Sequence, residues 1–250
     1  MATHISRRTL LSRLPALSGL VLTGCSRETF MPPRVRGGLI GAADVLTMST
    51  NRLLLSRQPL AREYSRADIA DPFPTWNQTN PRSAEYQRHL SGRFTEWRLP
   101  VSGLVARPVS LSLDEIRSLP VRTQITSHVC EQGWSAIGEW TGAPLQRVLD
   151  AAGGVLPSAR YVAVETFDGW YEGYDLFEVA HPQTILAYGL NGRDLPTGNG
   201  APLRLRVERQ CGYKNLKFVR SIQAVDSMTA FGKGTGGINS DFGFHWFAGV

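Results

Sequence analysis

The stretch Val121–Ser135, VRTQITSHVCEQGWS, is the part of the sequence from which the fold is best inferred. Val121–Val129 predicts a strand, and the residues after Cys130 include the glycine expected of a loop. Cys130 is therefore expected where a strand ends in a loop, a place from which a side chain is easily presented to a ligand. His128 is expected on the same face as Cys130 because side chains alternate along a strand.

The residue types around Cys130 are compatible with four roles. The chain has three cysteines and no Cys-x-x-Cys pair, which argues against a structural zinc site. Cys130 could form a disulfide with Cys211 in an oxidising compartment, or each could be a buried apolar thiol. A nucleophile pair of Cys130 with His128 is conceivable, although strand geometry separates such side chains by roughly 6–7 Å, farther than a hydrogen bond reaches. A lone soft thiolate also suits a metal held mainly by other ligands.

Short strands and short helices are predicted along the rest of the chain. The predicted strands lie at 97–105, 121–129, 161–167, 184–190, 203–207 and 217–225. The predicted helices begin near 110–112 and span 144–152 and 175–180. In 203–207, apolar residues alternate with Arg204 and Arg206, which predicts a strand with one face exposed. Because strands outnumber helices, the expected fold class is α+β with β-rich mixed sheets.

Residues 1–25 predict an export signal. The sequence SRRTLL at 6–11 precedes an apolar run at 14–22 that is too short to span a bilayer, which is typical of a twin-arginine signal. We therefore expect a periplasmic protein that uses the twin-arginine export machinery. The run ends in LTGC, similar to a bacterial lipoprotein box, so Cys25 is a candidate lipid anchor. The alternative to a twin-arginine signal is an ordinary signal peptide with two chance arginines, and the alternative to a lipid anchor is a cysteine that happens to lie near a normal cleavage site.

The remaining chain divides into an arm and a domain. Residues 26–93 are polar, with Pro and Arg throughout, and predict an extended arm with one short helix near 51–56. The ordered domain is expected over 94–250. The chain has 27 basic and 21 acidic residues, and without the three arginines of the export signal 24 basic residues remain. The basic residues are scattered, which argues against nucleic-acid binding.

An ordered set of motifs begins at Cys130. After CEQGWS at 130–135 come WTGAPL at 140–145, ETF at 165–167, HP at 181–182, LAY at 186–188, NGAPLRL at 199–205 and GYKNLK at 212–217. In this order the motifs resemble the sulfite-oxidase-like molybdopterin-binding domain family. Within it, the first two motifs resemble the metal-ligand loop of the catalytic subunits of periplasmic methionine sulfoxide reductases. The resemblance covers about half of the chain.

The resemblance implies a sulfite-oxidase-like fold and a molybdenum-molybdopterin cofactor. The thiolate of Cys130 would bind the molybdenum beside a pterin dithiolene and oxo groups, and His128 would line the metal pocket or pack beside it. Arginine can bind a phosphate bidentately, and lysine adds a point charge. The residues implied to hold the pterin and its phosphate are Asn77, Thr166, Asn199, Arg204, Asn215, Leu216 and Lys217.

Three departures from the family bear on the substrate. The sulfoxide reductases have an Asn-Asn-x-Tyr-Glu cofactor loop before the cysteine, whereas this chain has only Asn77, Asn80 and Tyr86, without that spacing. Gly133-Trp134-Ser135 stands where sulfite oxidases have Gly-Asn-x-Arg, which disfavours sulfite. Arg209-Gln210-Cys211-Gly212 stands where the sulfoxide reductases have Trp-Lys-Tyr-Gly, which argues against assigning methionine sulfoxide itself. The expected reaction is oxygen-atom transfer on a small S-oxide or related substrate.

Electrons are expected to come from a separate protein. The chain has no haem-attachment Cys-x-x-Cys-His, so a membrane cytochrome b or a soluble cytochrome c is the expected partner. Two other function classes remain open. One is a cofactor-free periplasmic binding or scaffold lipoprotein of the same fold, and the other is a thiol hydrolase that uses Cys130 and His128.

Overall fold

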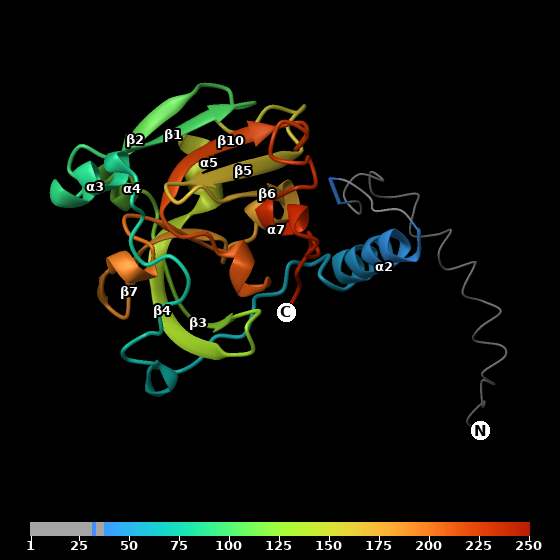
Figure 1. The fold of residues 1–250 in the computed structure, drawn as a ribbon, viewed down its shortest axis with the longest axis horizontal. Helices are drawn as coiled ribbons and strands as arrows, with labels where there is room; N and C mark the ends of the chain where they lie inside the picture. Colours follow the sequence, from blue (N-terminus) through green and yellow to red (C-terminus); the bar gives the residue numbers. More distant parts are fainter. Residues whose placement is uncertain (1–31, 34–37) are drawn as a thin grey trace.

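A computed structural model describes residues 32–33 and 38–250, so the predicted export signal, including Cys25, lies outside the described residues. Figure 1 shows two β-sheets surrounded by short helices, with helix α2 at one side of the molecule. Over the described residues, no helix has both the length and the apolar character needed to cross a bilayer. The α+β class with mixed sheets is confirmed.

The first sheet has the strand order β2-β1-β10-β5-β6. Its strands are β2 (Val109–Ser112), β1 (Arg98–Gly103), β10 (Val219–Val225), β5 (Tyr161–Thr166) and β6 (Tyr171–Asp175). β1 and β10 run parallel, and the other neighbours are antiparallel. The turn between β5 and β6 and the segment that leads into β10 both approach the pocket described below.

The second sheet has the order β3-β4-β7-β8, and β9 also pairs with β7. Its strands are β3 (Arg122–Val129), β4 (Ser135–Pro144), β7 (Ile185–Leu190), β8 (Arg193–Asp194) and β9 (Arg204–Arg206). β3 and β4 form a hairpin in which Val129 pairs with Ser135, so residues 130–134 are its tip. Cys130 therefore lies directly after a strand, as predicted.

Strand β4 was not among the predicted strands. It contains Gly138 and Gly142, and glycine has a low strand propensity. A Cβ at Gly142 would lie 2.2 Å from the carbonyl oxygen of Leu186 on β7, and one at Gly138 would lie 2.9 Å from the ring of Phe73. The two glycines allow neighbouring chain segments to approach closely, which local sequence patterns do not reveal.

The helices are short and several are capped by side chains. The Ser112 hydroxyl accepts a hydrogen bond from the N–H of Glu115 at the start of α4 (Leu113–Ser118), and Asp175 caps α6 (Leu176–Val179). Helix α5 (Leu145–Ala151) follows β4 directly. The chain ends after the short helix α7 (Ile238–Asp241). Helices α4, α5 and α6 lie close to their predicted positions, whereas α7 was not predicted.

The arm differs from the prediction of an extended segment with one short helix. It contains α2 (Gly38–Leu54), which has 17 residues, the single turn η2 (Arg66–Asp68) and α3 (Ala84–Ser91). The short helix expected near 51–56 is the end of α2. Between α2 and α3 the chain is mostly extended and crosses the β3–β4 hairpin, where the N–H of Tyr64 donates to the carbonyl of Ile125 at 2.9 Å.

The main hydrophobic core joins the two sheets. It includes Leu99, Val164 and Ile222 from the first sheet and Leu186 and Leu205 from the second, all fully buried. Burial of aliphatic side chains of this size is worth about 1.5–3 kcal/mol each. This core holds β9 and the segment before β10 in place, and both carry residues of the pocket.

Candidate functional site

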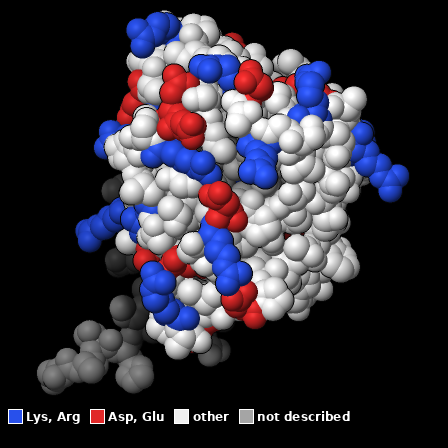
Figure 2. Space-filling model, turned by 90° about the vertical axis from the view of Figure 1, so that its left-hand side faces the viewer, with Lys and Arg blue, Asp and Glu red and all other residues white. Residues whose placement is uncertain are grey.

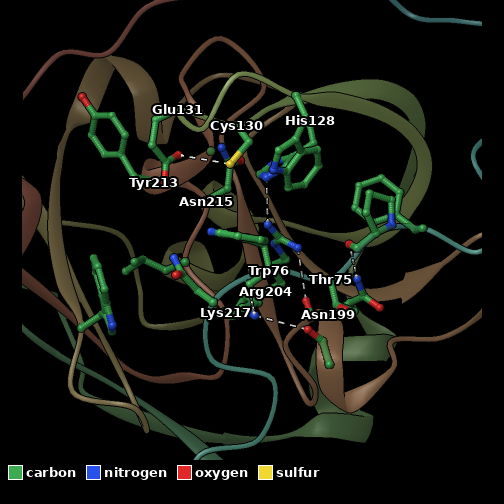
Figure 3. Close-up of a pocket in the computed structure, with 18 of the residues that line it drawn as sticks. Thr75, Trp76, His128, Cys130, Glu131, Asn199, Arg204, Tyr213, Asn215 and Lys217 are labelled. Carbon is green, nitrogen blue, oxygen red and sulfur yellow. Dashed lines mark hydrogen bonds between the residues drawn. The ribbon is translucent and has the colours of Figure 1, made fainter.

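A pocket lies at the tip of the β3–β4 hairpin (Figure 3). Segments far apart in the sequence supply its walls: the arm, the hairpin tip, the β5–β6 turn, the residues before β9 and the segment before β10. Eight of the nine predicted site residues line it. They are Asn77, His128, Cys130, Asn199, Arg204, Asn215, Leu216 and Lys217.

Cys130 is held at the pocket wall by the turn that follows it. Its N–H donates to the carbonyl of Trp134 at 2.9 Å, and Gly133 adopts a φ of +88° that favours glycine. The Sγ atom lies 3.7 Å from a carboxylate oxygen of Glu131. Burial, with a further contribution from Glu131, raises the pKa of the Cys130 thiol. The thiolate therefore needs a cation to stabilise it.

His128 is buried on one face of β3. Its ring is held by two arginines and not by Cys130. Its Nδ1 lies 2.8 Å from Nη1 of Arg206, and its Nε2 lies 3.4 Å from Nη2 of Arg204. A neutral imidazole has one acceptor nitrogen, so the shorter contact assigns Nδ1 as the acceptor and leaves the proton on Nε2. Burial and then the charges of Arg204, Arg206 and Lys217 lower the pKa of His128 well below its usual value.

Both arginines of β9 are buried, which corrects the prediction of a strand with one exposed face. Arg206 donates to Glu208 at 2.6 Å, and its guanidinium lies 4.3 Å from the ring centre of Trp140. Arg204 lies 5.2 Å from the same ring. Stacking on an aromatic ring makes the burial of a guanidinium possible. The alternation of apolar and charged residues in 203–207 does not indicate the contacts with Trp140 and Glu208.

Arg204 has few partners for a buried guanidinium. Its Nη1 donates to the carbonyl of Asn199 at a long 3.4 Å, its Nε has no partner among the described residues, and the nearby Nε2 of His128 carries a proton. Burial and then Arg206 lower the pKa of Arg204 to about 9. An anion in the pocket would stabilise this buried cation, because the guanidinium has few hydrogen-bond partners and no bonded counter-charge in the described chain. The donor set therefore fits the phosphate of a pterin cofactor.

Lys217 extends this positive wall. Its Nζ donates to the carbonyl oxygens of Trp76, Gln78 and Gly198, with distances of 2.7 Å to Trp76 and 3.3 Å to Gly198. Burial and then Arg204 lower the pKa of Lys217 to about 8. Lys217 thus joins the arm to the pocket wall and carries a charge that an anion would stabilise.

Close packing around the pocket requires glycine at two positions. A Cβ at Gly212 would lie 3.0 Å from Nε2 of His128 and 3.2 Å from the Cα of Cys130. Gly200 has a φ of +115°, and a Cβ there would lie 2.9 Å from Cβ of Lys217. These glycines bring the segments before β9 and β10 close to the hairpin tip and its neighbours.

The asparagines of the pocket mainly shape its walls. The side chain of Asn199 donates to the carbonyl of Pro74 at 3.2 Å and so holds the arm, while Asn77 has a φ of +56°. Asn215 accepts from the N–H of Val207 at 2.7 Å and donates to the carbonyl of Cys211 at 3.0 Å. Because its side chain is occupied, Asn215 would offer a cofactor backbone contacts, as the resemblance implied together with Leu216.

Thr166 is the one predicted residue that does not line the pocket. Its hydroxyl lies 2.5 Å from Oδ1 of Asp168 and accepts from the N–H of Trp170 at 2.9 Å, which closes the β5–β6 turn. Asp168 and Trp170 line the pocket themselves. Thr166 therefore positions two pocket residues within its own turn.

Several pocket residues were not predicted from the sequence. They are Phe73, Pro74, Thr75, Trp76, Glu131, Trp134, Asp168, Trp170, Gly198 and Tyr213. The Asp168–Gly169 turn signal between two strands could have indicated one of them. The arm residues carried no such signal, because they reach the pocket only through the tertiary path of the arm.

The two cysteines of the described chain are free thiols, so the disulfide considered above is not formed. Of the described residues that line the pocket, Cys130 is the only thiol. No group of three or more His, Cys, Asp or Glu residues in the described part of the chain could hold a metal ion. Cys130 is suited to one soft bond to a metal whose other ligands come from a cofactor.

Comparison with known proteins agrees with this geometry. The family model for the oxidoreductase molybdopterin binding domain matches residues 88–230. A protein named as a protein-methionine-sulfoxide reductase subunit, YedZ1, from Azospira oryzae is 33% identical over 98% of this chain and 88% of its own length. The protein-methionine-sulfoxide reductase catalytic subunit MsrP of Xanthomonas campestris is 31% identical over 91% of this chain and 72% of its own length.

A solved structure shares the fold. The sulfane dehydrogenase SoxCD from Paracoccus pantotrophus matches with a TM-score of 0.50 and 25% identity, over 53% of this chain and 39% of that chain. This chain thus spans about two fifths of that solved chain. The resemblance inferred from the motifs is confirmed. The chain belongs to the oxidoreductase molybdopterin binding domain family and is a molybdopterin-binding oxidoreductase.

Proposed function

We propose that this chain is an exported oxidoreductase in which Cys130 binds molybdenum and the reaction is oxygen-atom transfer on a small S-oxide. The observation that carries the proposal is the buried Arg204, whose Nε has no partner in the described chain, in the same pocket as the Cys130 thiol. Figure 3 shows Cys130 and Glu131 on one side of the pocket and Arg204 and Lys217 on another. Cys130 is suited to binding the metal, and Arg204 and Lys217 are suited to binding an anion.

Cys130 would be the protein's ligand to the metal. Molybdenum-molybdopterin, when bound, supplies a centre that accepts and donates two electrons. Burial raises the pKa of Cys130, so the thiolate forms at neutral pH only when a cation stabilises it, and a coordinating metal does so. The turn hydrogen bond to Trp134 would orient the sulfur before the cofactor arrives.

Arg204 and Lys217 would hold the phosphate of the pterin. Arg204 is buried and fixed by stacking on Trp140, so little side-chain entropy is lost when it binds an anion. Lys217 would add a second charge at the side where the arm closes the pocket. Backbone groups of Asn215 and Leu216 lie on the same wall.

The substrate would meet an aromatic rim. Trp76, Trp134 and Tyr213 all line the pocket, and sulfur groups make favourable contacts with aromatic rings. The names of the Azospira and Xanthomonas relatives refer to methionine sulfoxide, which supports a thioether S-oxide as the substrate class. Methionine sulfoxide is therefore a candidate substrate to test. This chain differs from those reductases in having Arg209-Gln210-Cys211-Gly212 where they have Trp-Lys-Tyr-Gly.

Export and electron transfer complete the proposal. The sequence SRRTLL at 6–11 supports export of the folded, cofactor-loaded protein through the twin-arginine machinery, with Cys25 as a lipid attachment site. A separate cytochrome would exchange electrons with the enzyme. The relative from Xanthomonas is named a catalytic subunit, which supports a multi-subunit system.

A thiol hydrolase is disfavoured by the geometry. The Nδ1 of His128 accepts from Arg206, and no hydrogen bond joins His128 to Cys130 in the described chain. The pKa of Cys130 is raised, whereas a nucleophilic cysteine needs a lowered one. His128 is therefore placed as part of the pocket wall.

Metal analysis tests the cofactor. Protein matured in a host that makes the molybdenum cofactor is expected to contain about one molybdenum per chain, and Cys130→Ser is expected to lose most of it. Cys211→Ser is the matched control and should keep the metal. Wild-type protein free of molybdenum would overturn the proposal and favour the binding or scaffold lipoprotein.

Activity measurements test the reaction class. With a reduced dye as electron donor, the loaded enzyme is expected to reduce dimethyl sulfoxide, methyl aryl sulfoxides or methionine sulfoxide, and not to oxidise sulfite with ferricyanide. Turnover of a sulfoxide without any electron donor would contradict the need for an external partner. Efficient sulfite oxidation without sulfoxide reduction would contradict the proposed reaction.

A further inference from the structure

Glu131 places a carboxylate beside the thiol of Cys130. Its Oε2 lies 3.7 Å from Sγ of Cys130, and Figure 3 shows the two side chains together on one side of the pocket. Glu131 lines the pocket and is exposed, and exposed carboxylates are ionised at neutral pH. Of the basic residues in the described chain, none forms an ion pair with it. A negative charge therefore lies at the sulfur without a bonded counter-charge from the described residues.

The charge of Glu131 acts on the thiols around it. Burial raises the pKa of the Cys130 thiol most, Glu131 raises it further, and the opposing effect of Arg204 is smaller. Burial and then Glu131 also raise the pKa of Cys211. At the sulfur of Cys130, the negative charge of Glu131 therefore outweighs the positive charge of Arg204.

The basic side chains of the pocket have a different task in the loaded enzyme. Arg204 and Lys217 are the proposed partners of the pterin phosphate, which would neutralise their charges. Asp168, a second carboxylate that lines the pocket, is held by the Thr166 hydroxyl at 2.5 Å. With the phosphate bound, the charge that a substrate meets in the pocket would therefore be negative.

The outer surface offers little charge selection of its own. On the face shown in Figure 2, basic and acidic side chains are interspersed, and neither sign forms a large patch. The fields of such a mixed surface largely cancel, and salt screens exposed charges over about 8–10 Å. A charge discriminates between substrates most effectively when it lies close to the reacting atoms, as Glu131 does.

We propose that Glu131 selects against anionic substrates, so that the pocket favours neutral S-oxides over anions such as sulfite. The inference rests on the proposed function and adds the charge class of the substrate. A molecule that contacts Sγ of Cys130 lies within roughly 7 Å of the carboxylate, because a van der Waals contact adds about 3.5 Å. At that distance a unit charge disfavours an anion about threefold in a water-like medium, and more strongly where water is excluded.

Alkylation of Cys130 tests the proposal without molybdenum or turnover. The chain has three cysteines, so the full-length protein with Cys25→Ser and Cys211→Ser keeps Cys130 as its single thiol. The cofactor-free protein is treated at one pH with iodoacetamide, which is neutral, or with iodoacetate, an anion of nearly the same size. The thiolate fraction cancels in the ratio of the two rates, because the same thiolate attacks both reagents.

Glu131→Gln removes the charge and keeps the length of the side chain. At low ionic strength it should raise the iodoacetate-to-iodoacetamide rate ratio at least about threefold, and this increase should become smaller at high salt. Glu131→Asp keeps the charge and should keep the parent's ratio. Glu96→Gln makes the same change at an exposed position outside the pocket and should also leave the ratio unchanged. Circular dichroism confirms that each chain is folded.

The loaded enzyme gives a second measurement with a matched pair of sulfoxides. Methylsulfinylacetamide is neutral, and methylsulfinylacetate is its anionic counterpart. Glu131→Gln should raise kcat/KM for the anion relative to the amide at least about threefold, through a lower KM for the anion. If the loaded enzyme reduces no sulfoxide, the proposed function is wrong, whereas the alkylation ratio still decides whether Glu131 selects by charge.

Equal alkylation ratios in the parent and Glu131→Gln would overturn the proposal. An increase that Glu96→Gln reproduces, or that high salt does not reduce, would also overturn it. The same holds if Cys130 reacts with neither reagent, since a small molecule could then not reach the sulfur beside Glu131.

Discussion

Nη1 of Arg206 lies 2.8 Å from Nδ1 of His128, and this hydrogen bond connects the pocket wall to a buried ion pair. Arg206 is held in turn by Glu208, which also accepts from Nε2 of Gln124 at 2.8 Å. His128 and Gln124 lie on the same buried face of β3, and Cys130 follows the strand directly. The side chains behind the hairpin tip that carries Cys130 therefore form one buried polar network.

Glu208→Gln tests this network. The change leaves the buried guanidinium of Arg206 without its acid partner, which typically costs about 3–5 kcal/mol. We expect the free energy of unfolding, measured with urea at neutral pH, to fall by about 3 kcal/mol or more. The control is Asp194→Asn, which removes an exposed ion pair with Arg117 and should cost less than about 1 kcal/mol. Equal losses in the two variants would contradict the network.

Arg204→Met separates cofactor binding from folding. Arg204 is buried without an acidic partner, so replacing it with an apolar side chain of similar length should leave the stability of the cofactor-free protein unchanged or raise it by roughly 1 kcal/mol. The same change should sharply lower the molybdenum content of matured protein. Metal analysis and thermal melting of the cofactor-free chain measure the two effects. A variant that keeps its metal would show that Arg204 does not hold the cofactor.

Arg52→Met should release helix α2. The change leaves Asp175 without its arginine partner and removes one of the two arginines that bind Glu178. Loss of a buried partner of this kind costs about 3–5 kcal/mol, so α2 should detach more often. Hydrogen exchange should increase over residues 38–54 while β5 and β10 stay protected. Unchanged exchange in α2 would show that Met48 and its aromatic neighbours are sufficient to hold the helix.

His181 should make stability depend on pH. Its Nδ1 accepts from the N–H of Gln183 and its Nε2 donates to the carbonyl of Pro59, both at 3.2 Å, which requires a neutral ring. Burial and then Arg209 lower the pKa of His181 below its usual 6.5. The unfolded chain therefore binds more protons, and the contribution of His181 to stability, complete above pH 6.5, is lost as pH falls below it.

His181→Asn isolates this effect, because its Oδ1 can accept the same hydrogen bond but does not titrate. Urea unfolding between pH 7.5 and pH 5.5 should show a smaller decrease in stability for the variant. One linked proton changes the free energy of unfolding by at most about 1.4 kcal/mol per pH unit. Parallel curves for the two proteins would refute the assignment.

Local patterns predicted the elements that depend on nearby residues. The strands containing Val121–Val129 and Tyr161–Phe167 were predicted close to their observed bounds, and Ser112 caps α4 through a contact three residues away. Strand β4 was not predicted, because its glycines fit only against β7 and the arm. The length of α2 depends on buried ion pairs between Arg52 and residues more than 120 positions away.

The sequence by itself determined that Cys130 follows a strand and shares a face with His128, because side chains alternate along a strand and a glycine loop ends it. Its ordered motifs also determined the family. Only the tertiary structure decided that Arg204 is a buried cation with an unpartnered nitrogen instead of a surface charge. The physical reason is that β9 pairs with β7 and its arginines stack on Trp140 of β4, which lies more than 60 residues earlier in the chain. No local pattern encodes these contacts.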